Sequence, residues 1–131
     1  MRWRKSADQL MKLRIRGNSI RLRLSQGDLA ALLDGGAVED SVVFPAGPVL
    51  TYRLEMGAGE SAEADYATDR VVIRFPVAEI ETWARPDEVT MRAELPLGDG
   101  LLELLVEKDF RCLSPRDGED DTDLFANPSA S

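Results

Sequence analysis

The 131-residue chain contains no histidine, a single cysteine and no apolar run near the length of a membrane span. The missing histidine excludes imidazole base catalysis, Ser-His and Cys-His nucleophile systems, and zinc sites built on Cys and His. The lone Cys112 cannot form a disulfide within the chain, which suits a reducing compartment. The opening residues, Met-Arg-Trp-Arg-Lys, also lack the apolar stretch of a signal peptide. We therefore expect a soluble cytoplasmic protein with no membrane partner.

Charge is unevenly distributed along the chain. The formal net charge is −8, yet residues 1–24 contain eight Lys and Arg against one Asp, while residues 25–131 contain eight cations against 23 acids. An acidic total argues against a nucleic-acid partner. The basic opening is typical either of a binding surface or of a strand that meets acidic neighbours across a sheet.

A β-hairpin is predicted at the start of the basic segment. From Lys12 apolar and charged residues alternate, Gly17-Asn18 interrupts the alternation, and a second alternating run follows to Leu24. A Gly-Asn pair between such runs indicates a two-residue turn. With this turn Ile15 pairs with Ile20, and all the apolar side chains of the hairpin lie on one face.

The order strand, helix, strand, strand is predicted twice, in residues 20–56 and 70–109. The first helix begins after Ser25 and ends at Gly35-Gly36; the second begins near Pro76 and ends before Arg85-Pro86. This pattern predicts an α+β fold: a twisted antiparallel sheet of about seven or eight strands, open or closed into a half-barrel, with two helices related by a pseudo-twofold axis.

The predicted domain covers residues 11–113. Residues 1–10 form an N-terminal extension, and residues 57–69, which are small and acidic, form a loop that links the two repeats. Residues 114–131 have the composition of a mobile acidic tail, because they contain little apolar material to bury. Within this tail, Leu124-Phe125 is typical of a docking motif, or of a segment that folds back over the sheet.

The chain resembles a family of small bacterial proteins of unknown function. The resemblance rests on the run KLRIRGNSIRLRL from Lys12 to Leu24, on Leu50 to Leu54, and on the closing run from Glu107 to Leu113. It covers nearly everything after residue 10. It implies a single-domain bacterial protein and no catalytic residue. By topology alone, the chain also resembles the duplicated effector-binding domains of some transcription regulators.

The candidate binding site is the arginine-rich face of the predicted sheet. In the hairpin register Lys12 lies opposite Arg23, and Arg14 lies opposite Arg21. Like charges in such positions are destabilising by up to about 1 kcal/mol per pair. We place these cations on one face: Lys12, Arg14, Arg16, Arg21, Arg23, Arg53, Arg74 and Arg92. Four carboxylates are predicted on the same face: Glu55, Glu94, Glu103 and Glu107.

Two interpretations of this face stay open at this point. Its charges can form a lattice of solvated ion pairs, each of little energetic value. Alternatively, guanidinium groups from adjacent strands can bind a phosphate or a carboxylate through paired hydrogen bonds. We favour a non-enzymatic module that binds an anionic small molecule or an acidic segment, with no cofactor.

A metal-dependent phosphohydrolase of the triphosphate-tunnel type is the alternative. The run from Leu13 to Gly17 is similar to a strand of these enzymes, which line a barrel with Arg and Lys and hold a metal ion with acids two residues apart. Glu107 and Asp109 are the one such acidic pair on a predicted strand. The Glu-x-Glu-x-Lys strand of those enzymes is missing.

Overall fold

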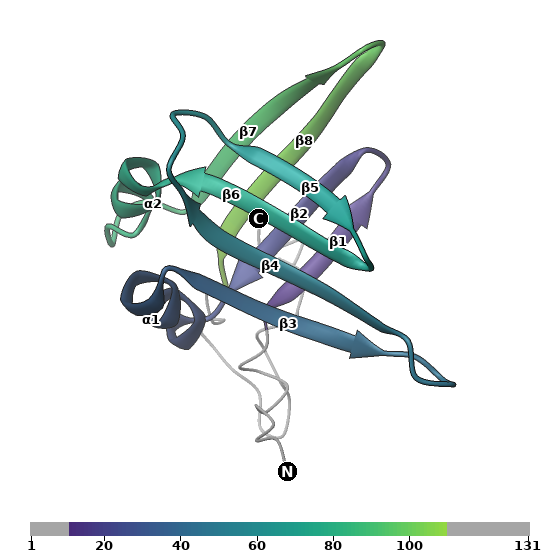
Figure 1. The fold of residues 1–131 in the computed structure, drawn as a ribbon. Helices are drawn as coiled ribbons and strands as arrows, with labels where there is room; N and C mark the ends of the chain where they lie inside the picture. Colours follow the sequence, from purple (N-terminus) through teal and green to yellow (C-terminus); the bar gives the residue numbers. More distant parts are fainter. Residues whose placement is uncertain (1–10, 110–131) are drawn as a thin grey trace, which may run out of the picture.

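The computed structural model describes residues 11–109, which form eight strands and two helices (Figure 1). In chain order the elements are β1 (Lys12–Arg16), β2 (Ser19–Leu24), α1 (Gln26–Gly35), β3 (Ala37–Val43), β4 (Val49–Gly57), β5 (Glu63–Ala67), β6 (Arg70–Pro76), α2 (Val77–Trp83), β7 (Thr90–Leu97) and β8 (Gly100–Lys108). The α+β class is confirmed. The predicted extension 1–10, residues 110–113 and the acidic segment 114–131 lie outside the described residues.

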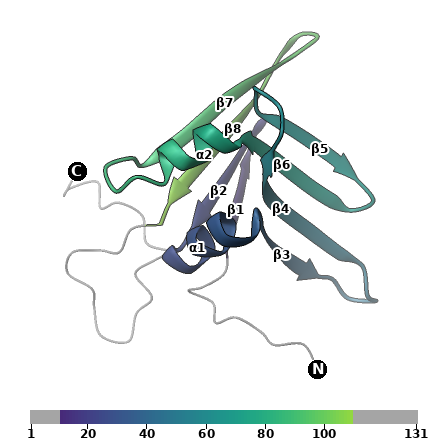
Figure 2. The same cartoon turned by 60° about the vertical axis from the view of Figure 1, so that its left-hand side comes forward.

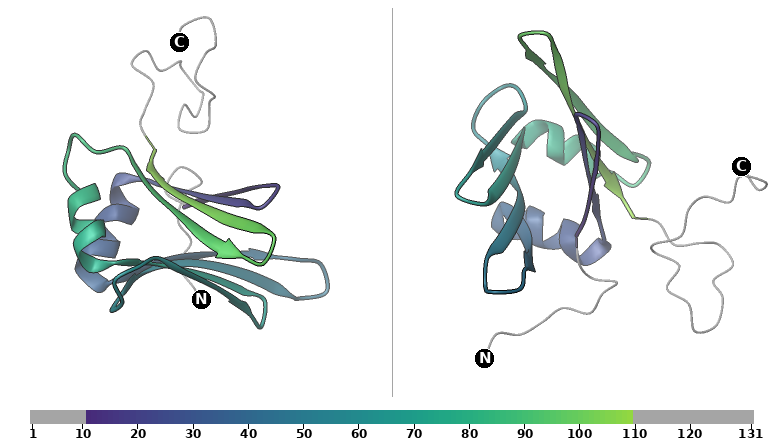
Figure 3. Two further views of the ribbon diagram at one scale, coloured as in Figure 1. Left: turned by 90° about the horizontal axis from the view of Figure 1, so that it is seen from above. Right: turned by 90° about the vertical axis from the view of Figure 1, so that its right-hand side faces the viewer.

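The strands form two four-stranded sheets. Sheet A has the order β1-β2-β8-β7, and sheet B has the order β3-β4-β6-β5. Each sheet consists of two antiparallel hairpins joined by a central parallel pair, β2 with β8 and β4 with β6. Figure 3 shows the sheets as separate layers with both helices at one end, and Figure 2 shows the layers diverging away from the helices.

The prediction of one antiparallel sheet was therefore wrong in two respects: the strands form two sheets, and each sheet is mixed. A single sheet of eight strands would expose most of its apolar face, because two short helices can cover only a few strands. Two sheets packed face to face cover each other's apolar side chains instead.

One hydrophobic core joins the two sheets and both helices. Sheet A contributes Leu22 and Leu104, and sheet B contributes Leu54 and Phe75, all of them fully buried. Leu32 of α1, with Ile80 and Trp83 of α2, closes the same cluster. The side chains that alternate with these core residues lie on the outer face of each sheet.

The predicted β1–β2 register is confirmed in detail. Lys12 pairs with Arg23, Leu13 with Leu22, Arg14 with Arg21 and Ile15 with Ile20. Gly17 has a φ of 56°, a value that favours glycine and suits the first position of a two-residue hairpin turn.

Both helix boundaries also follow the sequence signals. The Ser25 hydroxyl accepts a hydrogen bond from the Asp28 amide, and the Asp28 carboxylate accepts one from the Ser25 amide, which forms a capping box. Gly36 ends α1 in the left-handed conformation with φ 83°. Pro76 precedes the first residue of α2.

Residues 57–69 are not only a loop, as we predicted, because β5 lies within them. β5 is an edge strand whose Glu63 and Asp65 lie opposite Arg74 and Val72 of β6. The turn from β5 to β6 uses Thr68 and Asp69, with φ of 53° and 60°. Neither residue is a glycine, so the sequence carries no ordinary signal for this hairpin.

Candidate functional site

Most of the predicted cations lie together on the outer face of sheet A. Leu22 and Leu24 point into the core, so Arg21 and Arg23 point outward, and the same alternation applies to the neighbouring strands. We call this outer surface the arginine face. Its cations are Lys12, Arg14, Arg16, Arg21, Arg23 and Arg92.

Three arginines lie in one row across the sheet. Arg14 pairs with Arg21, Arg21 with Leu105, and Leu105 with Arg92. Adjacent strands are about 4.8 Å apart, so the row extends about 14 Å from β1 to β7. The next row along the strands contains Lys12, Arg23 and Glu107. The row therefore places Arg14 and Arg21 on neighbouring strands and Arg92 two strands from Arg21, with Leu105 between them.

The carboxylates nearest to Arg21, Arg23 and Arg92 make only long contacts with them. Glu107 lies 3.3 Å from Arg23 and 3.8 Å from Arg21. Arg92 lies 4.0 Å from Glu103, which is the limit of an ion pair. Within residues 11–109 no carboxylate forms an ion pair with Arg16, and Glu94 pairs in register with another acid, Glu103. The contacts of Arg21 and Arg92 are too long for good hydrogen bonds, so these two guanidinium groups can still donate to an anion.

Arg53 and Arg74, which we predicted on the same face, lie on the outer face of sheet B instead. The Glu55 carboxylate accepts a hydrogen bond of 2.6 Å from the Nε of each of these arginines. Arg74 also contacts Asp65 at 2.5 Å and Glu63 at 3.4 Å. The structure thus separates these two arginines from the other six cations.

The lattice on sheet B is compact and nearly neutral. Three arginines share four carboxylates there: Arg53, Arg70, Arg74, Glu39, Glu55, Glu63 and Asp65. Hydrogen bonds from Arg53, and then from Arg74, lower the pKa of Glu55, and the bonds to Asp65 and Glu55 raise the pKa of Arg74. The ion-pair interpretation therefore describes sheet B, where the cations are already matched. The sequence did not indicate Glu39, Glu63, Asp65 and Arg70, because their strand partners were unknown.

Glu55→Gln tests this lattice. A carboxylate with a lowered pKa stabilises the fold above its unfolded pKa, and this contribution is lost as the pH falls through the folded value. We expect the variant to lose about 0.5 to 1 kcal/mol of unfolding free energy at pH 7 and much less at pH 3, measured by urea denaturation. The exposed Glu60, changed to Gln, is the control. An equal loss at both pH values would contradict the assignment.

The alternative metal ligands, Glu107 and Asp109, are both engaged by cations. Glu107 contacts Arg21 and Arg23, and Asp109 lies 3.0 Å from the Nζ of Lys12 with only 4% of its side chain exposed. Among the described residues no group of three His, Cys, Asp or Glu side chains could hold a metal ion. A metal ion at this pair would have to replace existing ion pairs.

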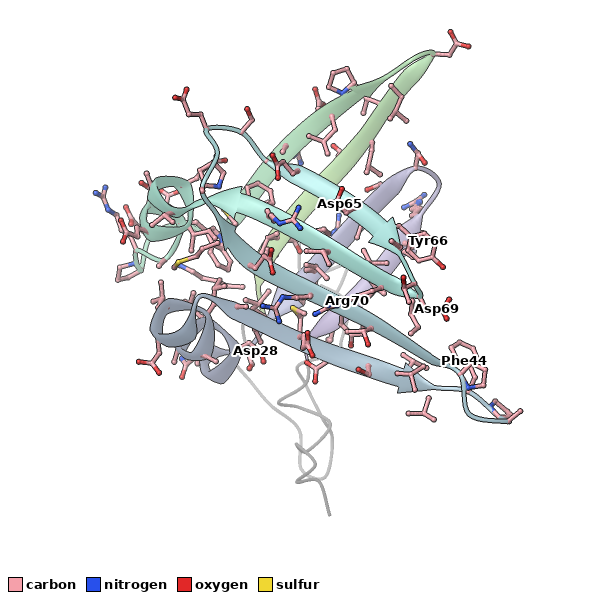
Figure 4. The ribbon with its side chains drawn as sticks, in the orientation of Figure 1. Asp28, Phe44, Asp65, Tyr66, Asp69 and Arg70 are labelled. Carbon is pink, nitrogen blue, oxygen red and sulfur yellow. The ribbon has the colours of Figure 1, made fainter. Side chains whose placement is uncertain are left out.

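The space between the sheets differs from an arginine-lined tunnel. The inward residues that form the core cluster are apolar, and the arginines of both sheets lie on the outer faces. Lys108, at the end of β8, lies on the inward side, with its Nζ 5.6 Å from the centre of the Trp83 ring. In Figure 4, Asp65 lies along β5, Tyr66 and Asp69 lie near the β5–β6 turn, and Phe44 lies near the β3–β4 turn.

A buried polar cluster that the sequence did not indicate fixes the start of β1. The Tyr52 hydroxyl donates to the Met11 carbonyl oxygen at 2.6 Å, and the Met11 amide donates to Asp40 at 2.9 Å. Burial, followed by the nearby charges of Asp40 and Asp28, raises the pKa of Tyr52 to about 12. These contacts hold β1, and with it Lys12 and Arg14, in position.

Comparison with known proteins agrees with the resemblance seen in the sequence. No curated protein and no solved structure matches this chain. No helix among residues 11–109 has the length and apolar character needed to cross a membrane. A family of unknown function, DUF7009, matches residues 11–129, which is 119 of the 131 positions and begins where β1 is anchored. The chain therefore belongs to the family of unknown function DUF7009.

Proposed function

We propose that the protein is a non-enzymatic binding module whose arginine face takes an anionic ligand, either a small molecule with phosphate or carboxylate groups or an acidic peptide segment. The observation that supports this most directly is the direct opposition of like charges, Lys12 with Arg23 and Arg14 with Arg21. Such pairs are destabilising on their own. An anion bound on the outer face between the two cations of such a pair would convert this repulsion into attraction.

The difference between the two outer faces supports the choice of sheet A. On sheet B the arginine to carboxylate distances fall to 2.5 and 2.6 Å, whereas on sheet A the contacts of Arg21, Arg23 and Arg92 with carboxylates range from 3.3 to 4.0 Å. Among residues 11–109 the arginine face has six cations and four carboxylates, Glu94, Glu103, Glu107 and Asp109. Guanidinium groups bind phosphate and carboxylate through paired hydrogen bonds, so the long contacts of Arg21 and Arg92 favour a polyanion.

Titration of the full-length protein with inorganic tripolyphosphate, by calorimetry, tests the proposal. We expect Arg21→Ala to weaken binding about tenfold or more, because a charge-assisted hydrogen bond contributes about 1.5 to 3 kcal/mol. Arg53→Ala is the matched control, since Arg53 lies on sheet B in the carboxylate lattice, and it should change binding less than twofold.

Equal affinity in the wild type, Arg21→Ala and Arg53→Ala would overturn the proposal. The titration is repeated with Mg²⁺ while phosphate release is measured. Release that depends on Glu107 would favour the phosphohydrolase instead.

We also infer that the two halves of the domain are related by duplication with a pseudo-twofold axis. The order of elements supports this: hairpin, helix, hairpin occurs from β1 to β4 and again from β5 to β8. Each sheet then combines one hairpin that precedes a helix with one that follows a helix. After a duplication the outer faces of the two sheets could diverge, so that the arginines of sheet B form short ion pairs and those of sheet A form longer ones.

A further inference from the structure

The arginine face contains one apolar side chain that does not belong to the core. Leu105 lies between Leu104 and Val106, which point inward, so its side chain points outward. Leu105 is only 4% exposed and is not part of the core cluster. The Leu105 side chain is therefore shielded from water, whereas the Arg21 and Arg92 side chains beside it are 35% and 61% exposed.

Leu105 has a charged residue beside it on each neighbouring strand. Its neighbours in register are Arg21 on β2 and Arg92 on β7. Leu105 is already shielded from water, so an occupant need not cover it, whereas a purely apolar ligand would bury guanidinium groups without partners at a considerable cost. The row therefore selects an occupant that carries several carboxylates.

We propose that the C-terminal segment of the same chain, residues 114–131, binds the arginine face and competes there with the anionic ligand. The segment contains five carboxylates and one arginine, followed directly by Leu124-Phe125. It therefore supplies carboxylates for Arg21 and Arg92, whose contacts with the carboxylates of sheet A are long, 3.8 and 4.0 Å. This inference rests on the proposed function, because it gives that site an internal competitor.

The path of the chain places the segment beside its docking surface. β8 ends at Lys108, and the next residue, Asp109, contacts Lys12 of the arginine face at 3.0 Å. Its amide also donates to the Leu24 carbonyl oxygen at 2.8 Å. Phe125 lies 16 positions after Asp109 in the chain. An extended chain of that length spans about 50 Å, several times the width of the row.

Tethering makes this competition effective even if the contact itself is weak. A segment joined by a short flexible linker has an effective concentration in the millimolar range at its binding surface. A free anion would have to exceed this concentration or bind more tightly. Neutralising the segment should therefore strengthen ligand binding, whereas neutralising an arginine of the face should weaken it.

The test compares three full-length proteins. The first is the wild type. The second carries four substitutions in the segment: Glu119→Gln, Asp120→Asn, Asp121→Asn and Asp123→Asn. The matched control carries four substitutions at exposed acids on or beside the helices: Asp34→Asn, Glu79→Gln, Glu81→Gln and Asp87→Asn. Both variants raise the net charge by four, so a difference between them reports position rather than total charge.

Two readouts separate this inference from the proposed function. Without ligand, NMR signals of the Arg14 and Arg21 side-chain Nε–H groups and of the Leu105 methyl groups should shift in the segment variant and not in the control. With tripolyphosphate, the segment variant should bind about tenfold more tightly than the control. Unshifted signals, together with tripolyphosphate affinities within twofold of one another, overturn the inference and leave the proposed function standing. Shifted signals with no tripolyphosphate binding by any of the three proteins support segment docking and overturn the binding of a small anion.

Discussion

Phe75→Ala is expected to lower the free energy of unfolding by about 3 to 5 kcal/mol, the range for truncating a large buried aromatic side chain. Phe75 is fully buried in β6, in the cluster that joins both sheets and both helices. A domain of this size is typically stable by about 5 to 15 kcal/mol, so the loss removes a large share of the total. Urea denaturation followed by circular dichroism measures it.

Val43→Ala is the control for this experiment. Val43 lies at the end of β3 and is 70% exposed, so its truncation should change the unfolding free energy by less than about 0.5 kcal/mol. If one core joins the two sheets, Phe75→Ala lowers the midpoint of a single transition. Loss of sheet B at lower urea concentration than sheet A, seen as two transitions, would contradict a shared core.

The second large effect is expected at alkaline pH and depends on Tyr52. The Tyr52 hydroxyl is buried, and its pKa is raised from 10 to about 12. A group with a raised folded pKa contributes its full stability below the unfolded pKa and loses that contribution as the pH rises through the folded value. A shift of two pKa units corresponds to about 2 to 3 kcal/mol, so the wild type should lose about this much between pH 10 and pH 12.

Tyr52→Phe isolates this contribution. The variant lacks the hydrogen bond to the Met11 carbonyl oxygen, so at pH 8 it should be about 1 kcal/mol less stable than the wild type. Above pH 10 the gap should close and then reverse, since phenylalanine has no hydroxyl to ionise. Parallel loss of stability in both proteins between pH 9 and pH 12 would contradict the buried position of Tyr52. Urea denaturation at each pH supplies the measurement.

The sequence predicted those turns and helix ends that are determined by residues close together in the chain. The Gly17-Asn18 turn sets the β1–β2 register, and Ser25 and Gly36 set the ends of α1. Each of these features is decided within a few residues of the chain. The same local register predicted the opposed cations of β1 and β2, Lys12 with Arg23 and Arg14 with Arg21. The central part of the candidate site could therefore be placed from the sequence.

Pairing between distant strands could not be predicted in this way. The parallel contact of β2 with β8 places Arg21 opposite Leu105, 84 positions later in the chain, and no local signal encodes it. For the same reason Arg53 and Arg74 were assigned to the wrong surface relative to Arg21. β5 was missed because its outward residues are acids and its turn residues, Thr68 and Asp69, are not those that ordinarily mark a hairpin.

The order of strands in sheet A has a consequence for folding. Its central pair joins β2, near the start of the chain, to β8, near the end of the described region. Contacts of high sequence separation slow folding, because a long loop must be closed before they form. During synthesis, the apolar side of β2 stays without its partner until nearly the whole domain has left the ribosome. Such a delay exposes a chain to aggregation. Charged residues at every second position of the first hairpin would oppose the association of nascent chains over that interval.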